Sequence, residues 1–468
     1  MGYLLTIFFT CFFFIATAQS GFQIRIKTTN IHADSLFVKS YNVKDKKFTK
    51  FLSSKFTNDI TINDKTPLMA GIYVIEADSV LLSEFLISDA QNQKFTISIL
   101  DEDITVEGSK ENSANRAYMQ KMLEFDNQLR ALDMEYQQLQ QSGMPTYMLQ
   151  TAMDSLLKKL DKIEADKRVY QEKTIEKNSG LLLASIIQSS LELLQPPKEY
   201  YRDRNKYFSF LSEHLFDNFP WEDERLLNTP LLYNKLKIFS QQILQLDPKF
   251  AIPVILNTLN ESKAKSRNMY YALFDYLEHD FGYYKSPFRE ETLYIAMLKD
   301  ILNTPDLDEM HELRMKYYER ELTLLSKNQT GEKAFNFNML LSTGDTVAMY
   351  DIDADFLMLY FQNPDCPTCG ELREKMKNME ILNIAIASGK LKIVTVYFEE
   401  NEKLWRNYLQ KRAVPNWIHG WNYDMQIEEE ELYDFRTIPM IMFLDKNKRV
   451  IKKDLLINEI EDWVKRFL

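Results

Sequence analysis

The sequence predicts a multidomain protein with an N-terminal antiparallel β-sandwich, a central all-α region and a C-terminal α/β domain. Three observations support this fold class. The chain has 468 residues, and at roughly 150 residues per domain this length suggests about three domains. The spacing of apolar residues changes twice, from period two to helical steps and then to strands alternating with helices. A Cys-x-x-Cys motif stands where the third region passes from a strand into a helix.

Residues 1–18 are expected to be a cleaved secretory signal peptide. An uncharged, mostly apolar run ends in Ala16-Thr17-Ala18, the small-x-small pattern of a signal-peptidase site. The run is shorter than the roughly 20 residues that span a bilayer. The mature chain would then begin at Gln19 in the periplasm or, alternatively, stay membrane-anchored and face it. Myristoylation at Gly2 and a lipid on Cys11 are weaker alternatives.

Residues 19–110 are predicted to form the β-sandwich. Short apolar segments with period-two alternation follow one another closely, which is typical of a small antiparallel sandwich. Its strands are expected at residues 22–27, 60–62, 71–75, 95–99 and 104–108.

Residues 111–328 are predicted to be helical. Apolar residues recur at three- and four-residue steps over residues 118–132 and 182–194, and Pro196-Pro197 ends the second of these helices. No fixed repeat period is present, so a solenoid is not supported. The many Tyr and Met side chains are expected to pack the helix core rather than to bind a cofactor.

Residues 329–468 read as strands alternating with helices. Continuous apolar strands are expected at residues 355–361, 391–398 and 440–444, and an amphipathic helix at residues 457–468. This order predicts βαβ units in a largely parallel sheet, with one hairpin at the edge after residue 444.

Composition excludes two classes of protein. The net charge is −11, so the chain lacks the basic surface that neutralises phosphates, and nucleic acid is not an expected partner. The chain has three cysteines, too few for a disulfide-stapled scaffold. Cys11 falls in the signal peptide, which leaves Cys366 and Cys369.

The motif Cys366-Pro367-Thr368-Cys369 is predicted to be a redox-active dithiol. Free N–H groups at a helix N-terminus stabilise a thiolate, so Cys366 is the expected attacking sulfur. Cys369 lies one turn on and would resolve the mixed disulfide. Pro367 suits the first helical position, because its missing N–H costs nothing there, and with Thr368 it supports the turn.

Two other roles for the motif are a structural disulfide and a zinc site. Closing a two-residue loop gains little entropy, which weakens the structural role. Zinc needs four ligands, and none of the histidines has a partner at ligand spacing. Those histidines are His32, His214, His279, His311 and His419. The last, His419, is expected at the surface or at a sheet end rather than beside the dithiol.

The order strand, Cys-x-x-Cys, helix, strand, helix, then Thr437-Ile438-Pro439 before a strand pair resembles the thioredoxin fold. The lead-in before residue 353 is similar to that of TlpA/ResA-like thiol–disulfide oxidoreductases, and the resemblance covers about residues 329–468. It implies that Pro439 is a cis-proline facing the dithiol and that the backbone of Ile438 binds an extended substrate. A β-domain followed by a helical region resembles the multidomain Bacteroidota members of this family.

The sequence departs from this family pattern around the motif. Asp365 replaces a frequent Trp, and its carboxylate is expected to raise the pKa of Cys366. Tyr360 stands where thioredoxin has a buried Asp, and Leu372 stands where a Glu is common. Glu374 replaces the usual kink proline, and Glu371 is the weak remaining candidate for a proton acceptor.

The expected function is therefore an exported thiol–disulfide oxidoreductase that reduces exported protein disulfides and needs no metal or cofactor beyond its dithiol. Its expected partners are exported protein thiols and disulfides and an electron-donor protein, with a homo-oligomer possible through the helical domain. The alternative is an extracytoplasmic binding protein in which the thioredoxin-like domain is accessory.

Overall fold

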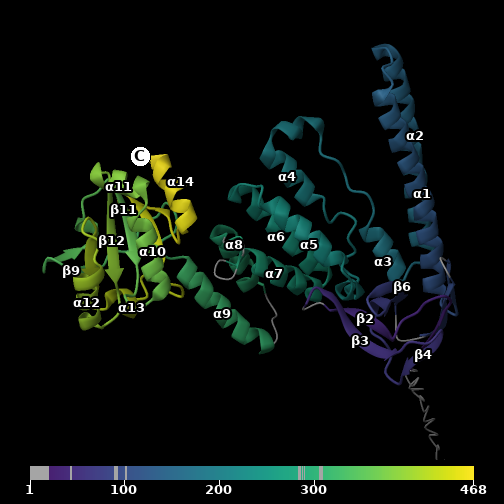
Figure 1. The fold of residues 1–468 in the computed structure, drawn as a ribbon, viewed down its shortest axis with the longest axis horizontal. Helices are drawn as coiled ribbons and strands as arrows, with labels where there is room; N and C mark the ends of the chain where they lie inside the picture. The colour runs from purple at the N-terminus through teal and green to yellow at the C-terminus, as the bar shows by residue number, and fades with distance from the viewer. Residues whose placement is uncertain are drawn as a thin grey trace, which may run out of the picture. The chain divides into compact units, whose positions relative to one another are not determined.

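The computed structural model describes residues 21–467, apart from 43–44, 89–92, 101–102, 283–285, 287, 289 and 305–308. The chain divides into two compact units, one ending at Leu293 and one beginning at Tyr294 (Figure 1). The predicted signal peptide lies outside the described residues. Among the helices that are described, none combines the length and apolarity that crossing a membrane requires.

The N-terminal β region consists of two four-stranded sheets, ordered β4-β1-β7-β8 and β3-β2-β5-β6 (Figure 1, purple). Their inward-facing residues form one shared core, as expected for a sandwich. The pairing of β1 with β7 is parallel, whereas the sequence predicted antiparallel strands throughout. These two strands are not joined by a hairpin, so no tight turn forces them to be antiparallel. The strands are β1 Phe22–Thr28, β2 Ser35–Asn42, β3 Lys47–Lys55, β4 Asp59–Asp64, β5 Gly71–Ala77, β6 Val80–Ile87, β7 Lys94–Leu100 and β8 Asp103–Glu107.

The central helices begin directly after β8. Ser109 caps the first helix, its side chain accepting a hydrogen bond from the Asn112 N–H at 3.2 Å. The buried residues Tyr118 and Phe125 of the predicted apolar stripe face α2, where Gln171 donates to the Tyr118 hydroxyl at 3.1 Å. The helices are α1 Lys110–Gln141, α2 Thr146–Lys177, α3 Leu182–Ser189, α4 Arg204–Glu213, α5 Leu231–Ile243, α6 Pro248–Lys265, α7 Arg267–Phe281, α8 Glu291–Leu302 and α9 Glu309–Leu325.

The C-terminal sheet is mixed, with strand order β10-β9-β13-β12-β11-β14-β15. Only β11–β12 and β12–β13 are parallel pairs, and a hairpin lies at each edge, so the predictions of a largely parallel sheet and a single hairpin were wrong. A strand buried on both faces is continuously apolar in either direction, so the pattern does not report orientation. The strands are β9 Asn338–Leu341, β10 Thr346–Ala348, β11 Phe356–Phe361, β12 Leu391–Tyr397, β13 Ile418–Trp421, β14 Met440–Asp445 and β15 Val450–Lys452.

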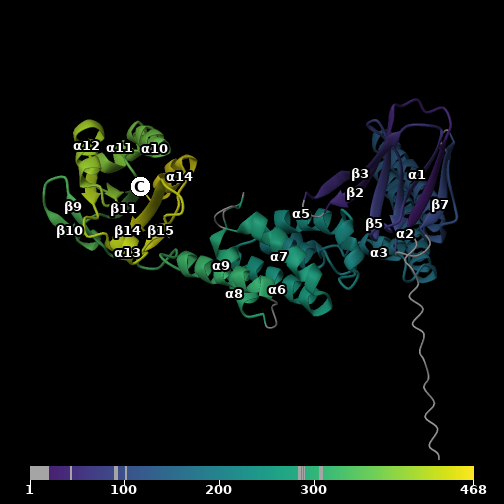
Figure 2. The same ribbon diagram turned by 90° about the horizontal axis from the view of Figure 1, so that it is seen from below.

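Both faces of this sheet are covered. Met358 and Tyr360 of β11 pack on one face with side chains of three helices, α10, α11 and α14. Leu357 and Leu359 pack on the opposite face with residues from the segments 334–352 and 427–433. Figure 2 shows α10, α11 and α12 together on one side of the sheet. The helices are α10 Pro367–Lys377, α11 Glu380–Ala387, α12 Glu402–Arg412, α13 Gln426–Glu429 and α14 Ile457–Phe467.

Candidate active site

The two cysteines lie at the N-terminus of α10, immediately after the loop that follows β11. Cys366 is the N-cap residue and Pro367 occupies the first helical turn. The Cys366 sulfur accepts a hydrogen bond from the Cys369 N–H at 3.3 Å and lies 3.1 Å from the Thr368 hydroxyl. The sulfur therefore takes the place of the side-chain oxygen that usually caps a helix, and the helix dipole favours negative charge on it.

The two thiols have different environments. Cys366 is half-buried, whereas Cys369 is fully buried. Partial burial alone would raise the pKa of the Cys366 thiol, but hydrogen bonds from Cys369 and Thr368 outweigh it and the net pKa is lowered. Burial, with a further contribution from Cys366, raises the pKa of Cys369 to about 12. The pair thus combines an accessible, acidic thiol with a buried, protonated one.

The loop before the cysteines is held by contacts that the sequence did not reveal. The Asp365 N–H donates to the Asn363 side chain at 2.8 Å, and the Cys366 N–H donates to the Asn363 carbonyl at 3.1 Å. Glu399 accepts from the Asn363 amide at 2.6 Å, and Arg412 donates to the Pro364 carbonyl at 2.9 Å. The turn propensity of Asn363 was a usable local signal. Glu399 and Arg412 come from distant segments of the chain, so no local sequence signal indicated their contacts.

Asp365 was expected to raise the pKa of Cys366, and the structure shows no such net effect. Its side chain is exposed, and the net pKa of Cys366 is lowered rather than raised. A solvated carboxylate interacts only weakly with a neighbouring charge, so the hydrogen bonds at the helix N-terminus prevail.

The Ile438–Pro439 peptide bond is cis. The next residue, Met440, begins β14 and pairs with Phe361, the last residue of β11. Because β11 leads from Phe361 into the cysteine loop, this register places Pro439 and the dithiol at the same end of the sheet. The structure therefore puts Ile438 and Pro439 on the side of the domain that the resemblance implied.

The segment before the cis-proline is tied to helix α9. The Arg436 Nε donates to Asp434 at 2.8 Å, and the same guanidinium contacts Glu321 of α9. Glu321 is buried, with 4% of its surface exposed, so this ion pair is shielded from solvent.

The residues that differ from the family pattern have identifiable positions. Tyr360 is buried, and its hydroxyl donates to the Cys369 carbonyl at 2.6 Å. Leu372 packs into the core beside α11, whereas Glu374 is exposed. Glu371 is also exposed and lies two residues after the buried Cys369, so helix geometry turns it away from that thiol. The weak suggestion that Glu371 accepts the proton is not supported by this placement.

A buried polar cluster formed by α10, α12 and β13 escaped the sequence reasoning. Arg373 of α10, Tyr408 of α12 and His419 of β13 are each buried, and the Arg373 guanidinium lies 5.5 Å from the centre of the Tyr408 ring. His419 is not a surface residue, since only 4% of its surface is exposed; it lies near the start of the short strand β13. Its Nδ1 lies 2.7 Å from the Thr395 hydroxyl and its Nε2 lies 3.0 Å from the Val414 carbonyl.

No metal centre competes with this site in the described part of the chain. Nowhere among those residues do three or more His, Cys, Asp or Glu side chains gather closely enough to hold an ion.

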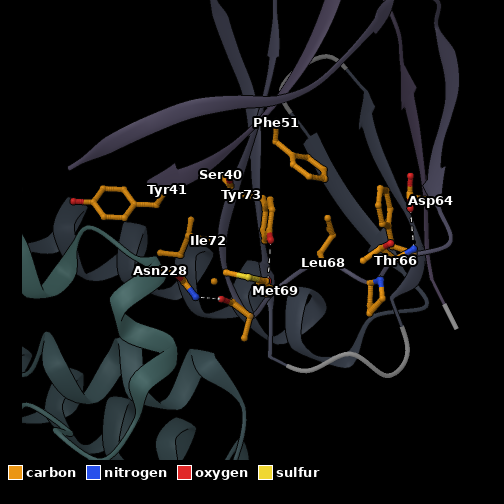
Figure 3. Close-up of a pocket in the computed structure, with 14 residues that line it drawn as sticks. Ser40, Tyr41, Phe51, Asp64, Thr66, Leu68, Met69, Ile72, Tyr73 and Asn228 are labelled. Carbon is orange, nitrogen blue, oxygen red and sulfur yellow. Dashed lines mark hydrogen bonds between the residues drawn. The ribbon is translucent and has the colours of Figure 1, made fainter. Parts of the chain in front are cut away.

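The N-terminal unit contains a separate cavity of about 450 Å³ at the β-sandwich (Figure 3). Phe51, Leu68 and Tyr73 line it, and Met69 is 68% exposed at its rim. The Tyr73 hydroxyl donates to the Met69 carbonyl at 2.8 Å, and Asn228 donates to the Ala70 carbonyl at 2.9 Å. Asp64 is the one charged side chain in the lining, so the cavity is apolar with a weakly acidic edge.

Two family models match the chain. Residues 354–450 match a thioredoxin-like family, and residues 148–328 match a domain of unknown function, DUF5106. No curated protein matches the chain.

Solved structures from Bacteroides species resemble the chain. A thioredoxin-like protein from Bacteroides caccae is 27% identical with a TM-score of 0.54, and the match covers 59% of this chain and 98% of that one. The C-terminal domain of an uncharacterized protein from Bacteroides fragilis is 32% identical with a TM-score of 0.29, covering 30% of this chain and 99% of that one. The thioredoxin domain of a thiol–disulfide oxidoreductase from Bacteroides vulgatus is 17% identical with a TM-score of 0.26, covering 30% and 97%.

The similarity to the Bacteroides caccae protein extends well beyond the residues that match the thioredoxin-like family. It therefore includes part of the chain upstream of the dithiol domain. With its sheet, its cysteine-capped helix and its cis-proline, the C-terminal part of the chain is a thioredoxin-like domain, and residues 354–450 belong to the thioredoxin-like family.

Proposed function

We propose that this protein is an exported thiol–disulfide oxidoreductase that reduces disulfides of exported proteins through Cys366 and Cys369. One observation carries the proposal: the Cys366 sulfur caps α10 and has a lowered pKa, while Cys369 one turn away is buried and has a raised pKa. This asymmetry gives each cysteine a distinct role in exchange.

In the proposed reaction, the Cys366 thiolate attacks one sulfur of a substrate disulfide. A mixed disulfide forms, and the first substrate sulfur leaves as a thiolate. Cys369 then loses its proton and attacks the Cys366 sulfur, which releases the second substrate thiol and leaves a Cys366–Cys369 disulfide. Two electrons have passed to the substrate, and the dithiol of an electron-donor protein returns the pair to its reduced form.

The substrate would lie along the cis-proline segment. Ile438 precedes the cis bond at the dithiol end of the sheet, and in this proposal its backbone groups pair with an extended chain. Main-chain pairing recognises conformation rather than sequence, which suits an enzyme acting on many unfolded or partly folded proteins.

Export is part of the proposal and rests on residues 1–18, with the periplasm as the compartment and membrane attachment as the variant form. The domain limits proposed are 19–110, 111–328 and 329–468. Self-association through the helical region remains part of the same proposal.

A redox titration of the mature protein tests the activity. We expect a two-electron transition between about −330 and −120 mV, the range spanned by catalytic dithiols. The matched variant Cys366→Ser should lose the transition while keeping its circular dichroism spectrum. A wild-type protein with no transition in this range would contradict the proposal.

A second candidate function is binding by the N-terminal unit, and the cavity at the β-sandwich favours it. Aromatic and aliphatic side chains line this cavity, with Asp64 as its one charged group. Such a surface suits an apolar side chain of a polypeptide and disfavours an anionic ligand.

The variants Phe51→Ala and Met69→Ser separate this binding function from the redox function. If the cavity holds substrate protein, both variants should raise KM for insulin reduction and leave the rate with a small aromatic disulfide unchanged. Unchanged kinetics with both substrates would remove the support for a binding function.

A further inference from the structure

Arg373 is a buried cation with incomplete pairing. Its residue exposure is 4%, and its Nε and Nη1 atoms have no hydrogen-bond partner. The one anionic group beside it is Glu374, whose carboxylate lies 3.7 Å from Nε and whose side chain is 55% exposed. A buried guanidinium normally has bidentate partners, because removing its charge from water is costly.

The Arg373 guanidinium lies against the turn that carries the dithiol. Arg373 follows Cys369 by four residues, so the two side chains share one face of α10. Helical side chains lean toward the N-terminus, and the Arg373 Nη2 would lie 3.7 Å from a Cβ placed on Gly370. The cation therefore reaches back by about one turn toward Cys369.

The groups around this cation offer no buried negative charge. Tyr408 of α12 presents its ring at 5.5 Å, and Tyr360 of β11 uses its hydroxyl to donate to the Cys369 carbonyl. His419 of β13 is held by Thr395 and by the Val414 carbonyl, and burial lowers its pKa, so it is neutral at pH 7. Burial raises the pKa of Tyr360, with Cys369 acting in the same direction and Arg373 in the opposite one.

This position is unfavourable for a cation in the resting protein. The guanidinium reaches toward the N-terminal part of α10, where the helix dipole already favours negative charge, and the carboxylate beside it belongs to the exposed Glu374. An anion formed in this place would be stabilised by the same features. The buried thiolate of Cys369 is such an anion, and it forms once per catalytic cycle.

We propose that the buried guanidinium of Arg373 stabilises the thiolate of Cys369 while that sulfur attacks the mixed disulfide at Cys366. The proton leaves Cys369, the new sulfur–sulfur bond forms between Cys369 and Cys366, and the second substrate thiolate departs. Arg373 itself stays protonated throughout and acts only through its charge. This inference rests on the proposed function. It explains how the Cys369 thiolate can form in a site that has no buried carboxylate beside it.

The test follows two steps separately in the full-length mature protein. Reduced protein is mixed with a small aromatic disulfide whose thiolate is coloured. The first coloured thiolate reports attack by Cys366, and the second reports attack by Cys369. Their rates are measured as a function of pH for wild type, Arg373→Met, Arg373→Lys and the control Arg406→Met, whose side chain is exposed and paired with Glu402.

We expect Arg373→Met to slow the second phase by about tenfold near pH 7, to move its pH midpoint upward, and to change the first phase less than twofold. Arg373→Lys should restore part of the rate, because it keeps the charge. Arg406→Met should match wild type. If Arg373→Met fails to fold, Arg373→Gln replaces it, since it also removes the charge but keeps a polar side chain. A wild-type second phase in folded Arg373→Gln would indicate a structural role and overturn the inference.

An unchanged second phase in a folded Arg373→Met protein would overturn the inference. Equal slowing of both phases, with no shift of the pH midpoint, would overturn it as well. A wild-type protein that releases no second coloured thiolate would instead contradict the proposed dithiol function, so the two failures are distinguishable.

Discussion

The N-terminal sheets and the C-terminal sheet differ in how many of their faces are covered. In β1, Phe22, Ile24 and Ile26 are buried while the residues between them reach the surface. In β11, every residue from Leu357 to Phe361 is buried. The first pattern belongs to a sheet with one solvated face, and the second to a sheet enclosed on both sides.

This difference separates two ways of building a functional surface. The enclosed strand β11 ends at a loop that leads into a helix N-terminus, so its reactive sulfur lies where the backbone supplies fixed N–H groups. The half-covered sandwich has no such terminus in its sheets and provides an apolar cavity instead. We therefore expect chemistry to depend on the C-terminal sheet and selectivity on the N-terminal one.

The largest expected effect is loss of the attacking sulfur. Cys366→Ser should lower the rate of disulfide reduction by more than about a thousandfold, because the nucleophile itself is removed. The control Leu81→Ser, at an exposed position of β6, should retain the wild-type rate. Comparable losses in both variants would show that chemistry is not confined to the C-terminal sheet.

The next effect concerns packing. Met358→Ala and Leu359→Ala, at adjacent positions of β11, should each lower the free energy of unfolding by about 2–5 kcal/mol, because both faces are buried. In β1, Ile24→Ala should have a similar cost, whereas Gln23→Ala should stay within about 0.5 kcal/mol. Hydrogen exchange resolved by peptide would measure each unit separately. A mild effect at either β11 position would contradict the two-sided burial.

A smaller effect is expected from matched tyrosine changes. Tyr360→Phe removes the donor to the Cys369 carbonyl and Tyr73→Phe the donor to the Met69 carbonyl, each costing about 1–3 kcal/mol. Only Tyr360→Phe should also change the alkylation rate of Cys369, because the hydroxyl of Tyr360 contacts the dithiol turn and that of Tyr73 does not. Iodoacetamide labelling with peptide mapping checks this, and an altered Cys369 rate in Tyr73→Phe would contradict it.

The smallest effect is the pH dependence of stability. The pKa of Cys369 is about 12 in the folded chain and ~8.5 when unfolded. Above about pH 8.5 the unfolded chain loses the Cys369 proton more readily than the folded chain does. The contribution of Cys369 to the free energy of unfolding is therefore complete below that pH and declines as the pH rises toward 12. The lowered pKa of Cys366 acts in the opposite sense and favours folding once its unfolded value is exceeded.

Urea midpoints of the reduced protein between about pH 7.5 and 10 test this dependence. The urea midpoints of Cys369→Ala should fall less steeply with rising pH than the midpoints of wild type. Parallel curves for the two proteins would show that Cys369 does not carry the expected proton linkage.

The local features of the site were predictable, whereas those made by distant segments were not. Spacing alone put Cys366 at a helix N-terminus, and the resemblance to the thioredoxin fold implied the cis bond at Pro439. Arg373, Tyr408 and His419 meet only because α10, α12 and β13 pack together, and no short-range pattern reports that contact. The prediction of strand direction was wrong for a related reason: the antiparallel strand β14 is as apolar as the parallel strands beside it.

The contact between Arg436 and Glu321 has a consequence for how the protein can be divided. A fragment that starts at residue 329 leaves out α9 and therefore removes the Glu321 carboxylate from the Arg436 guanidinium, three residues before the cis-proline. A fragment that starts upstream of α9 keeps the pair intact. An excised redox fragment should therefore start ahead of α9, upstream of the proposed domain limit at residue 329 and within the compact unit that begins at Tyr294.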